Sequence, residues 1–196
     1  MAWVKAEVHF ATLYSYRVPN TSPSFSPASP VPSPSAVRLA LVDAAIQRSG
    51  SVAEGRQVFD LVKDAPLRMV PPEGVCMSRA FVKRLKPGKG EELVESTGVR
   101  EYCHPLGPLE LYMEVQHQAD MVVSLFQEIR RLGTTDSLAY CIATAGVSPP
   151  EDLVVRPLNG QALALQEANF QGRMVVSLLE FPADVTFDAI NPYTPS

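Results

Sequence analysis

Residues 109–115 have the sequence Leu109-Glu110-Leu111-Tyr112-Met113-Glu114-Val115, in which an apolar side chain occupies every second position. A period of two is that of a β-strand with one buried face. Residues 119–132 follow with apolar side chains spaced three and four apart, which is typical of an amphipathic helix, and Gly133 comes directly after them. The sequence therefore predicts a strand over 109–115 and a helix over 119–132 that ends at Gly133.

The chain before this strand is predicted to begin with β-structure and to continue with two helices. Residues 3–10 have strand periodicity, and a serine-rich loop with six prolines between Pro19 and Pro34 follows them. A helix is expected from Pro34 to Gly50, with Ser33 or Ser35 as its N-terminal cap. Ser51 and Glu54 have the spacing of a capping box, which predicts the start of a second helix.

These elements, with strands predicted over 67–70 and 75–85, follow the order β–α–α–β–β–α–β. This order is that of an α+β, ferredoxin-like domain with one long hairpin inserted at about residues 79–100. We assign residues 1–132 to this domain and residues 133–196 to a small β-rich C-terminal region packed on it. Strands are expected there near 137–144, 153–155, 162–165 and 173–181. Because the fold hosts many functions, it does not decide between them.

The charge of the chain is unevenly distributed. The net charge is −4, but residues 1–100 hold 13 Lys/Arg against 9 Asp/Glu, and residues 101–196 hold 4 against 12. Two interpretations stay open on charge alone. The clustering is either chance on a solvated surface, or the molecule has one face for an anionic ligand and another for a protein partner.

Cysteine usage and motifs exclude several classes of protein. The three cysteines, Cys76, Cys103 and Cys141, form no Cys-x-x-Cys pair, which fits a reducing cytoplasm better than a disulfide framework or a zinc site. No apolar run approaches the roughly 20 residues of a membrane helix, and the N-terminus does not resemble a signal peptide. Motifs for phosphate-cradling loops, metalloproteases and serine hydrolases are absent. We expect no cofactor, no metal and no contact with a membrane.

Basic residues gather in the expected hairpin. They are Arg79, Lys83, Arg84, Lys86, Lys89 and Arg100, and they are interspersed with Glu91, Glu92 and Glu95. Two strands that carry cations could lie along a phosphate backbone, each contact adding a counterion-release contribution to affinity. A solvated hairpin of mixed charge is equally consistent with the composition.

Aromatic and histidine side chains supply two further candidates. Tyr14, Tyr16 and Arg17 follow the first strand, and such residues can stack on unpaired bases and bind phosphate, although the tyrosines could instead pack the loop against the sheet. His104, with Tyr102, Arg100 and nearby lysines, could form a metal-free RNA-cleaving cluster. The alternative, that His104 only ends a strand before Pro105, is favoured. His9 is expected to be a half-buried structural residue.

Three segments in order resemble a known family. They are Phe-Ala-Thr-Leu-Tyr-Ser-Tyr-Arg at 10–17, Pro-Val-Pro-Ser-Pro-Ser-Ala-Val-Arg at 30–38, and Arg-Glu-Tyr-Cys-His-Pro at 100–105 before the strand at 109–115. Together they resemble the Cas-five family of the RAMP superfamily, over about residues 1–132. The resemblance implies an RRM-related domain with a thumb hairpin at about 79–100. The sequence departs from the family at Leu39, where a glycine is often found. It also has only the isolated Gly160 and Gly172 in place of a glycine-rich loop.

The resemblance also implies a function and its partners. Such proteins hold the 5′ repeat-derived handle of the CRISPR RNA at one end of the backbone filament of a type I Cascade complex. They contact the backbone subunit and the large subunit that recognises the PAM, and target DNA near the PAM is a further contact to consider. The implied handle site, near the N-terminus of the first helix, and the implied thumb together comprise Tyr14, Tyr16, Arg17, Ser33, Ser35, Arg38, Arg79, Lys83, Arg84, Lys86, Lys89 and Arg100.

Three hypotheses follow. The first is a non-catalytic, cytoplasmic RNA-binding subunit of a type I CRISPR Cascade surveillance complex. The second is a metal-independent endoribonuclease that processes precursor CRISPR RNA, with Tyr102, His104 and Lys86 as catalytic candidates. The third is an unrelated ferredoxin-like binding module without a role in RNA binding.

Overall fold

The structure is a computed structural model of the 196-residue chain. It describes residues 1–19, 21, 25–88, 92–152, 154–155 and 178–190. The strand expected near 162–165, most of the one expected over 173–181, and Lys89 lie outside these residues.

A four-stranded antiparallel sheet forms the centre of the molecule. Its strand order is β3-β6-β1-β7, made of β1 (Ala2–Phe10), β3 (Leu67–Val70), β6 (Leu109–Val115) and β7 (Ala139–Ala145). The strands predicted at 3–10, 67–70 and 109–115 are confirmed. The strand predicted near 137–144 is β7, and it pairs with β1 in this same sheet.

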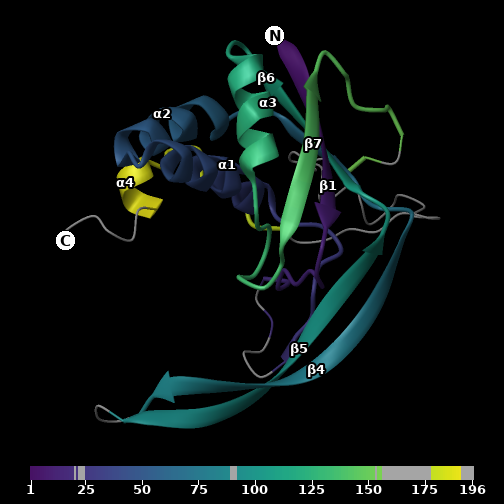
Figure 1. Cartoon of the computed structure of the whole chain (residues 1–196), viewed down its shortest axis with the longest axis vertical. Helices are drawn as coiled ribbons and strands as arrows, with labels where there is room; N and C mark the ends of the chain where they lie inside the picture. The colour runs from purple at the N-terminus through teal and green to yellow at the C-terminus, as the bar shows by residue number, and fades with distance from the viewer. Residues whose placement is uncertain (20, 22–24, 89–91, 153, 156–177, 191–196) are drawn as a thin grey trace, which may run out of the picture.

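Helices cover one face of the sheet. They are α1 (Pro34–Ser49), α2 (Val52–Val62) and α3 (Ala119–Glu128), and Figure 1 shows them on one side of β1 and β6. The apolar side chains at alternate positions of the strands point to this side. Val4 and Val8 of β1 and Leu111 and Met113 of β6 are fully buried there. No helix in the described part of the chain is long and apolar enough to cross a membrane.

The caps of the first two helices differ. The side chain of Ser33 caps α1 by accepting a hydrogen bond from Ala36 N at 3.1 Å, and Gly50 ends the helix in the left-handed conformation with φ 68°. At α2 the predicted capping box is wrong. Ser51 makes no side-chain cap bond. Its amide donates to Ser49 Oγ at 3.1 Å, and Glu54 accepts a hydrogen bond from Arg48 at 2.8 Å instead of reaching back to that amide.

The predicted end of the third helix is also wrong. Helix α3 ends at Glu128 rather than near Gly133, since Ile129 adopts an extended conformation with ψ 127°. The backbone beyond it pairs with the residues that lead into β7, with Ala139 N donating to Arg130 O at 2.9 Å and Leu132 N to Ser137 O at 3.1 Å. Pairing with β7 therefore competes successfully with the helical periodicity of 129–132.

The C-terminal segment packs on the helices. Phe59 of α2 makes edge-on contacts with the rings of Phe181 and Phe187, the latter at the start of α4 (Phe187–Ile190). Residues 178–181 form no strand, so this part of the strand expected over 173–181 is wrong. Upstream, Val155 forms an isolated antiparallel bridge to Met69 of β3.

A long hairpin, residues 74–106, projects from the body, and we call it the arm. Its strands are β4 (Gly74–Pro87) and β5 (Leu93–Leu106), paired antiparallel along their whole length. Figure 1 shows the arm running away from the central sheet. The short strand β2 (Phe25–Ser26) pairs in parallel with β5 near the base of the arm. The hairpin expected at 79–100 thus extends further in both strands.

Candidate nucleic-acid interface

The register of the arm divides its residues between two faces by parity. Arg79 pairs with Glu101, Ala80 with Arg100, and this spacing continues without a bulge to the tip. Directly paired residues share a face and successive residues alternate between faces. Odd-numbered residues of both strands therefore lie on one face, which we call the inner face, and even-numbered residues lie on the other, the outer face.

The cations of the inner face are paired with acids. Arg79 Nε donates to Glu101 Oε1 at 3.0 Å, and Lys83 Nζ lies 3.4 Å from Glu95 Oε2. The carboxylate of Glu101 is buried, whereas Lys83 and Glu95 are both largely exposed, and an exposed pair of that kind contributes only about 0–1 kcal/mol. Lys83 in particular could exchange its carboxylate for a phosphate at small cost.

The outer face carries cations without acids. Arg100, Tyr102 and His104 occupy alternate positions of β5, opposite Ala80, Ser78 and Cys76. The backbone positions of Arg84 and Lys86 belong to the same face, opposite Ser96 and Val94. No even-numbered residue of β4 or β5 is Asp or Glu. Of the basic residues predicted in the hairpin, the register thus places the backbone positions of Arg84, Lys86 and Arg100 on one face, and that face has basic residues and no acidic ones.

The predicted catalytic trio is only partly brought together. Tyr102 and His104 are neighbours on the outer face, and His104 is exposed. Lys86, however, lies opposite Val94, which is ten residues from His104 along β5. At about 3.3 Å per residue this is about 33 Å, so Lys86 cannot act on the same bond as His104.

The hydroxyl groups at the start of α1 form a connected chain. Tyr16 Oη donates to Ser33 Oγ at 2.6 Å, and Ser33 Oγ lies 2.9 Å from Ser35 Oγ. The helix start is already satisfied, because Ser35 donates to Leu179 O through both its amide, at 3.4 Å, and its hydroxyl, at 3.1 Å. The expected free amides for phosphate are therefore occupied by the cap and by the C-terminal segment.

Two residues of the expected handle site are buried. Tyr14 is 1% exposed and packs against the ring of Phe10, and burial raises the pKa of its phenol. Arg38 donates to Val62 O, Ala65 O and Glu180 Oε2 at 2.7–2.9 Å. Neither side chain is free to contact RNA in this conformation. The ring of Tyr14 is enclosed by protein, and Arg38 donates hydrogen bonds through all three of its guanidinium nitrogens.

Arg17 is exposed on a small hairpin beside the arm. Its backbone forms a bridge with Ala28, and its guanidinium binds Thr21. Ala28 N in turn donates to Glu101 Oε2 at 3.1 Å. The buried carboxylate of Glu101 thus joins the arm, through Arg79, to the strand that supports Arg17.

Glu101 was not among the sequence-predicted residues. The signal that could have found it is its place in β5, one residue from Arg100 and two from the buried Cys103, since an acid at a buried strand position requires partners. Burial also raises the pKa of Cys103 to about 11 and that of Cys141 to about 12, and all three cysteines are free thiols.

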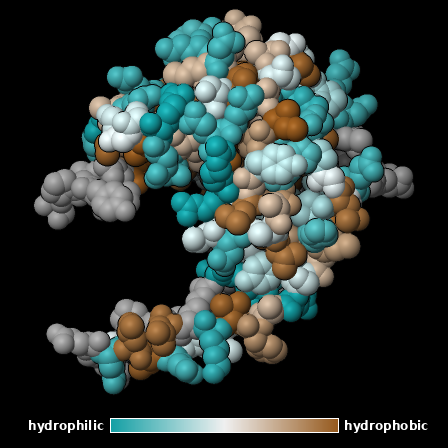
Figure 2. Space-filling view, in the orientation of Figure 1, coloured by the Kyte–Doolittle hydropathy of each residue, from teal (hydrophilic) through white to brown (hydrophobic). Residues whose placement is uncertain are grey.

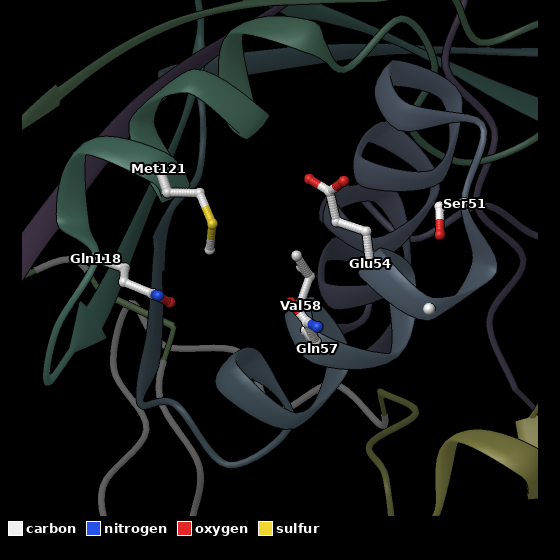
Figure 3. A pocket seen from close by; sticks show the side chains of 7 residues that line it. Ser51, Glu54, Gln57, Val58, Gln118 and Met121 are labelled. Atoms are coloured by element: carbon white, nitrogen blue, oxygen red, sulfur yellow. The ribbon is translucent and has the colours of Figure 1, made fainter.

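A pocket of about 350 Å³ lies between α2 and the start of α3 (Figure 3). Glu54, Gln57 and Gln118 give it polar walls, and Val58 and Met121 line it with apolar atoms. Its lining residues include one acid and no cation, which does not suit a phosphate. The pocket is formed by the helices and receives no residue of the arm.

No family model matches the chain. CRISPR-associated protein Cas5 from Archaeoglobus fulgidus is 32% identical over 198 residues, covering 99% of this chain and 86% of that protein. A crystal structure of a CRISPR protein from Archaeoglobus fulgidus has a TM-score of 0.44 and 12% identity over 74% of this chain and 64% of that one. A cryo-EM structure of the type III-B Cmr-beta bound to cognate target RNA has a TM-score of 0.49 and 12% identity, over 74% and 60%. The chain spans less than two thirds of the length of these two structures.

Full-length similarity to a curated relative, on an α+β fold with antiparallel sheets, defines the class of the protein as a CRISPR-associated protein of the RAMP superfamily. Within that class, the chain belongs to the Cas5 family. The hypothesis of an unrelated binding module is therefore wrong.

Proposed function

We propose that this protein is a non-catalytic subunit of a CRISPR effector complex of type I, Cascade, in which it binds the 5′ repeat-derived handle of the CRISPR RNA and caps the backbone filament. The observation that carries the proposal is the outer face of the arm in a member of the Cas5 family. Arg100 and the positions of Arg84 and Lys86 share this face with Tyr102 and no acid.

The topology supports a ferredoxin-like core. Helices follow β1 and β6, and the strand order β3-β6-β1-β7 is the order expected when two β-α-β halves interleave their strands. The arm is inserted between β3 and β6, as expected for a thumb between the second and third strands of such a core.

The outer face suits single-stranded RNA. Cations spaced along a strand can follow successive phosphates, and the ring of Tyr102 can stack on an unpaired base. Arg17, exposed on the loop joined to the arm through Glu101, is a further cation that we assign to the handle. Tyr14 and Arg38 are removed from the set of proposed RNA contacts, because the fold buries both.

The inner face suits another subunit. Phe81 is 81% exposed and Leu85 is 63% exposed, and Leu93 shares their face near the tip. Figure 2 shows hydrophobic side chains gathered at this far end of the arm. Large apolar groups in such a cluster mark a surface that is buried in an assembly. We assign it to the backbone subunit, and we keep the large subunit and target DNA near the PAM as further proposed contacts of the complex.

The test is RNA binding by the full chain purified with its partner subunits. Arg100→Ala should weaken binding to repeat-derived RNA and reduce the salt dependence of the affinity by about one phosphate contact. Arg56→Gln is the matched control, since Arg56 is an exposed cation of α2 paired with Asp188, remote from the arm. Equal affinity and equal salt dependence of the two variants would contradict the proposal.

Endonucleolytic processing is the second candidate, and the exposed His104 with the half-buried Tyr102 and Arg100 on the same face favours it. Labelled precursor RNA incubated with the protein and EDTA separates the two candidates. Cleavage that His104→Ala abolishes would establish the nuclease, whereas intact RNA bound by the wild-type protein supports the non-catalytic role.

A further inference from the structure

A stacked aromatic pair lies on the central sheet, away from the proposed handle site. The rings of His9 and Tyr140 are nearly parallel, with centroids 4.9 Å apart and an interplanar angle of 8°. The two residues are direct partners in the register of β1 and β7. Because their neighbours Val8 and Cys141 are buried under the helices, alternation places the stacked pair on the opposite face of the sheet.

The Tyr140 ring keeps half of its surface exposed although His9 stacks on it. His9 covers the side toward β1, and β7 is the last strand in the order of the sheet. Tyr140 is nevertheless 51% exposed. Because His9 stacks on one face of the ring, the exposed area belongs to the ring edge and the other face, on the side where Arg131 pairs with the start of β7.

A cation stands beside this ring. Arg131 forms an antiparallel bridge with Leu138 at the start of β7 and is exposed. Bridged residues share a face, and Leu138 and Tyr140 share one by alternation, so Arg131 and Tyr140 are diagonal neighbours across the pairing. Such neighbours are about 7–8 Å apart, within reach of long side chains. Residues 101–196 contain only four Lys/Arg, so a cation at this position is notable in an acidic half.

The surrounding charges favour a base over a cluster of phosphates. Glu7, two residues before His9, is paired with Lys5 at 2.8 Å. Asp136 is exposed in the loop before β7. A surface with an exposed aromatic ring, Arg131, an exposed acid and an internally neutralised Lys5–Glu7 pair suits a stacked nucleobase with a single phosphate contact.

The position connects to the loop that carries Tyr16 and Arg17. Ala11 N donates to Leu138 O at 2.9 Å, and Ser15 N donates to Ser137 Oγ at 3.1 Å. The residues that lead into β7 are therefore bonded along the same loop that continues into the proposed handle site. A strand of RNA that leaves Arg17 can therefore continue along the hydrogen-bonded contact between residues 11–15 and 137–138 to the edge of β7.

We propose that Tyr140, backed by His9 and flanked by Arg131, stacks on one unpaired base of the RNA bound by this protein. The site rests on the proposed RNA-binding function and adds a specific contact to it. Tyr16 and Arg17 hold the RNA at the loop, and Tyr140 holds one base at the border of the sheet. The rival occupant is a partner protein, which the exposed Leu138 and Ile142 on the same face could also suit.

The test uses RNA with the sequence of the repeat-derived handle from the host's own CRISPR array, with 2-aminopurine at one position per molecule. The full chain and its partner subunits are prepared as wild type, Tyr140→Ala, Tyr140→Phe, Arg131→Ala and Ile142→Ala. Ile142 is the matched control, because it is 58% exposed on the same face of β7 and has no ring to stack.

We expect one 2-aminopurine position to be quenched by the wild-type protein and by Tyr140→Phe, but not by Tyr140→Ala. Tyr140→Ala should lose about fivefold or more in RNA affinity, whereas Ile142→Ala should lose none. Arg131→Ala should lower the salt dependence of binding by about one contact.

Three results would overturn the proposal. Equal RNA affinity and quenching for Tyr140→Ala and Ile142→Ala would exclude the stacking site while leaving the proposed function intact. Loss of a partner subunit in both variants, with RNA binding unchanged, would assign the surface to that subunit. A wild-type protein that binds no handle RNA, alone or with partners, would exclude the proposed function together with this site.

Discussion

Glu101 accepts a hydrogen bond from Arg79 across the two strands of the arm, with Nε and Oε1 3.0 Å apart. The other carboxylate oxygen, Oε2, accepts the Ala28 amide at 3.1 Å. One buried side chain therefore sets the position of the arm relative to the loop that bears Arg17. Both proposed RNA contacts depend on this link, although Glu101 itself carries the wrong charge to touch a phosphate.

Replacement of Glu101 should loosen this link. Glu101→Ala leaves the buried Ala28 amide without an acceptor, which costs about 1–3 kcal/mol in the free energy of unfolding. Glu101→Gln keeps one carbonyl oxygen for that amide and should recover part of the loss. Urea unfolding of the wild type and both variants measures the difference. Equal destabilisation by Ala and Gln would contradict the assigned role of the Ala28 bond.

Arg38 should be essential for stability rather than for RNA binding. Arg38→Ala removes donors from Val62 O and Ala65 O at buried positions, and we expect a loss of about 3 kcal/mol in the free energy of unfolding. Arg48→Ala is the matched control in the same helix. Arg48 pairs with Glu54 near the surface, so its loss should cost about 0–1 kcal/mol. Thermal or denaturant unfolding that ranks the two variants equally would contradict the structural role of Arg38.

Much of the central sheet could be predicted from the sequence. Residues 109–115 are a strand within the bounds predicted, because one face is buried and the period of two is unbroken. Helix α3 was predicted too long, since periodicity alone does not reveal that the backbone of Arg130 pairs with Ala139. Ile129 and Leu132 remain buried after the helix ends, so packing outside the helix uses the same apolar residues.

The candidate site was less predictable, for two physical reasons. Whether Tyr14 points outward or inward depends on its pairing with Cys103, which is a contact between distant parts of the chain. The division of the arm into a basic outer face and a paired inner face depends on the register of β4 and β5. A shift of one residue in the turn would move Arg100 and Glu101 to different partners, and composition does not determine that register.

The half-buried Lys5–Glu110 contact between β1 and β6 should respond to acid through Glu110. Burial raises the pKa of this carboxyl. Hydrogen bonds from Lys5 and Tyr112 lower the pKa by more than burial raises it, so the net pKa lies below its usual value. A lowered pKa in the folded state means that the stabilisation is present above the unfolded pKa of about 4.3 and is lost as pH falls through the folded value.

Glu110→Gln should therefore reduce the slope of stability against pH below about pH 4.5. Glu114→Gln is the control, since Glu114 is also in β6 but has no ion pair among the described residues. Denaturant unfolding at several pH values gives the slope, and an unchanged slope in Glu110→Gln would contradict the contribution of this pair.

The apolar end of the arm should matter to assembly and not to folding. Phe81 and Leu85 are exposed on the inner face, and their removal exposes no core, so the double change Phe81→Ser, Leu85→Ser should leave the unfolding free energy within about 0.5 kcal/mol. If the backbone subunit covers this surface, the loss of two large apolar contacts should weaken its association by about tenfold or more, since each buried side chain of this size contributes about 1.5–3 kcal/mol.

Co-purification and titration with the backbone subunit measure this, with Leu39→Ser, an exposed leucine of α1, as the matched control. Because Arg100 lies on the opposite face, RNA binding by the isolated chain should be unchanged in the double variant. Loss of RNA binding with normal subunit association would reverse the assignment of the two faces.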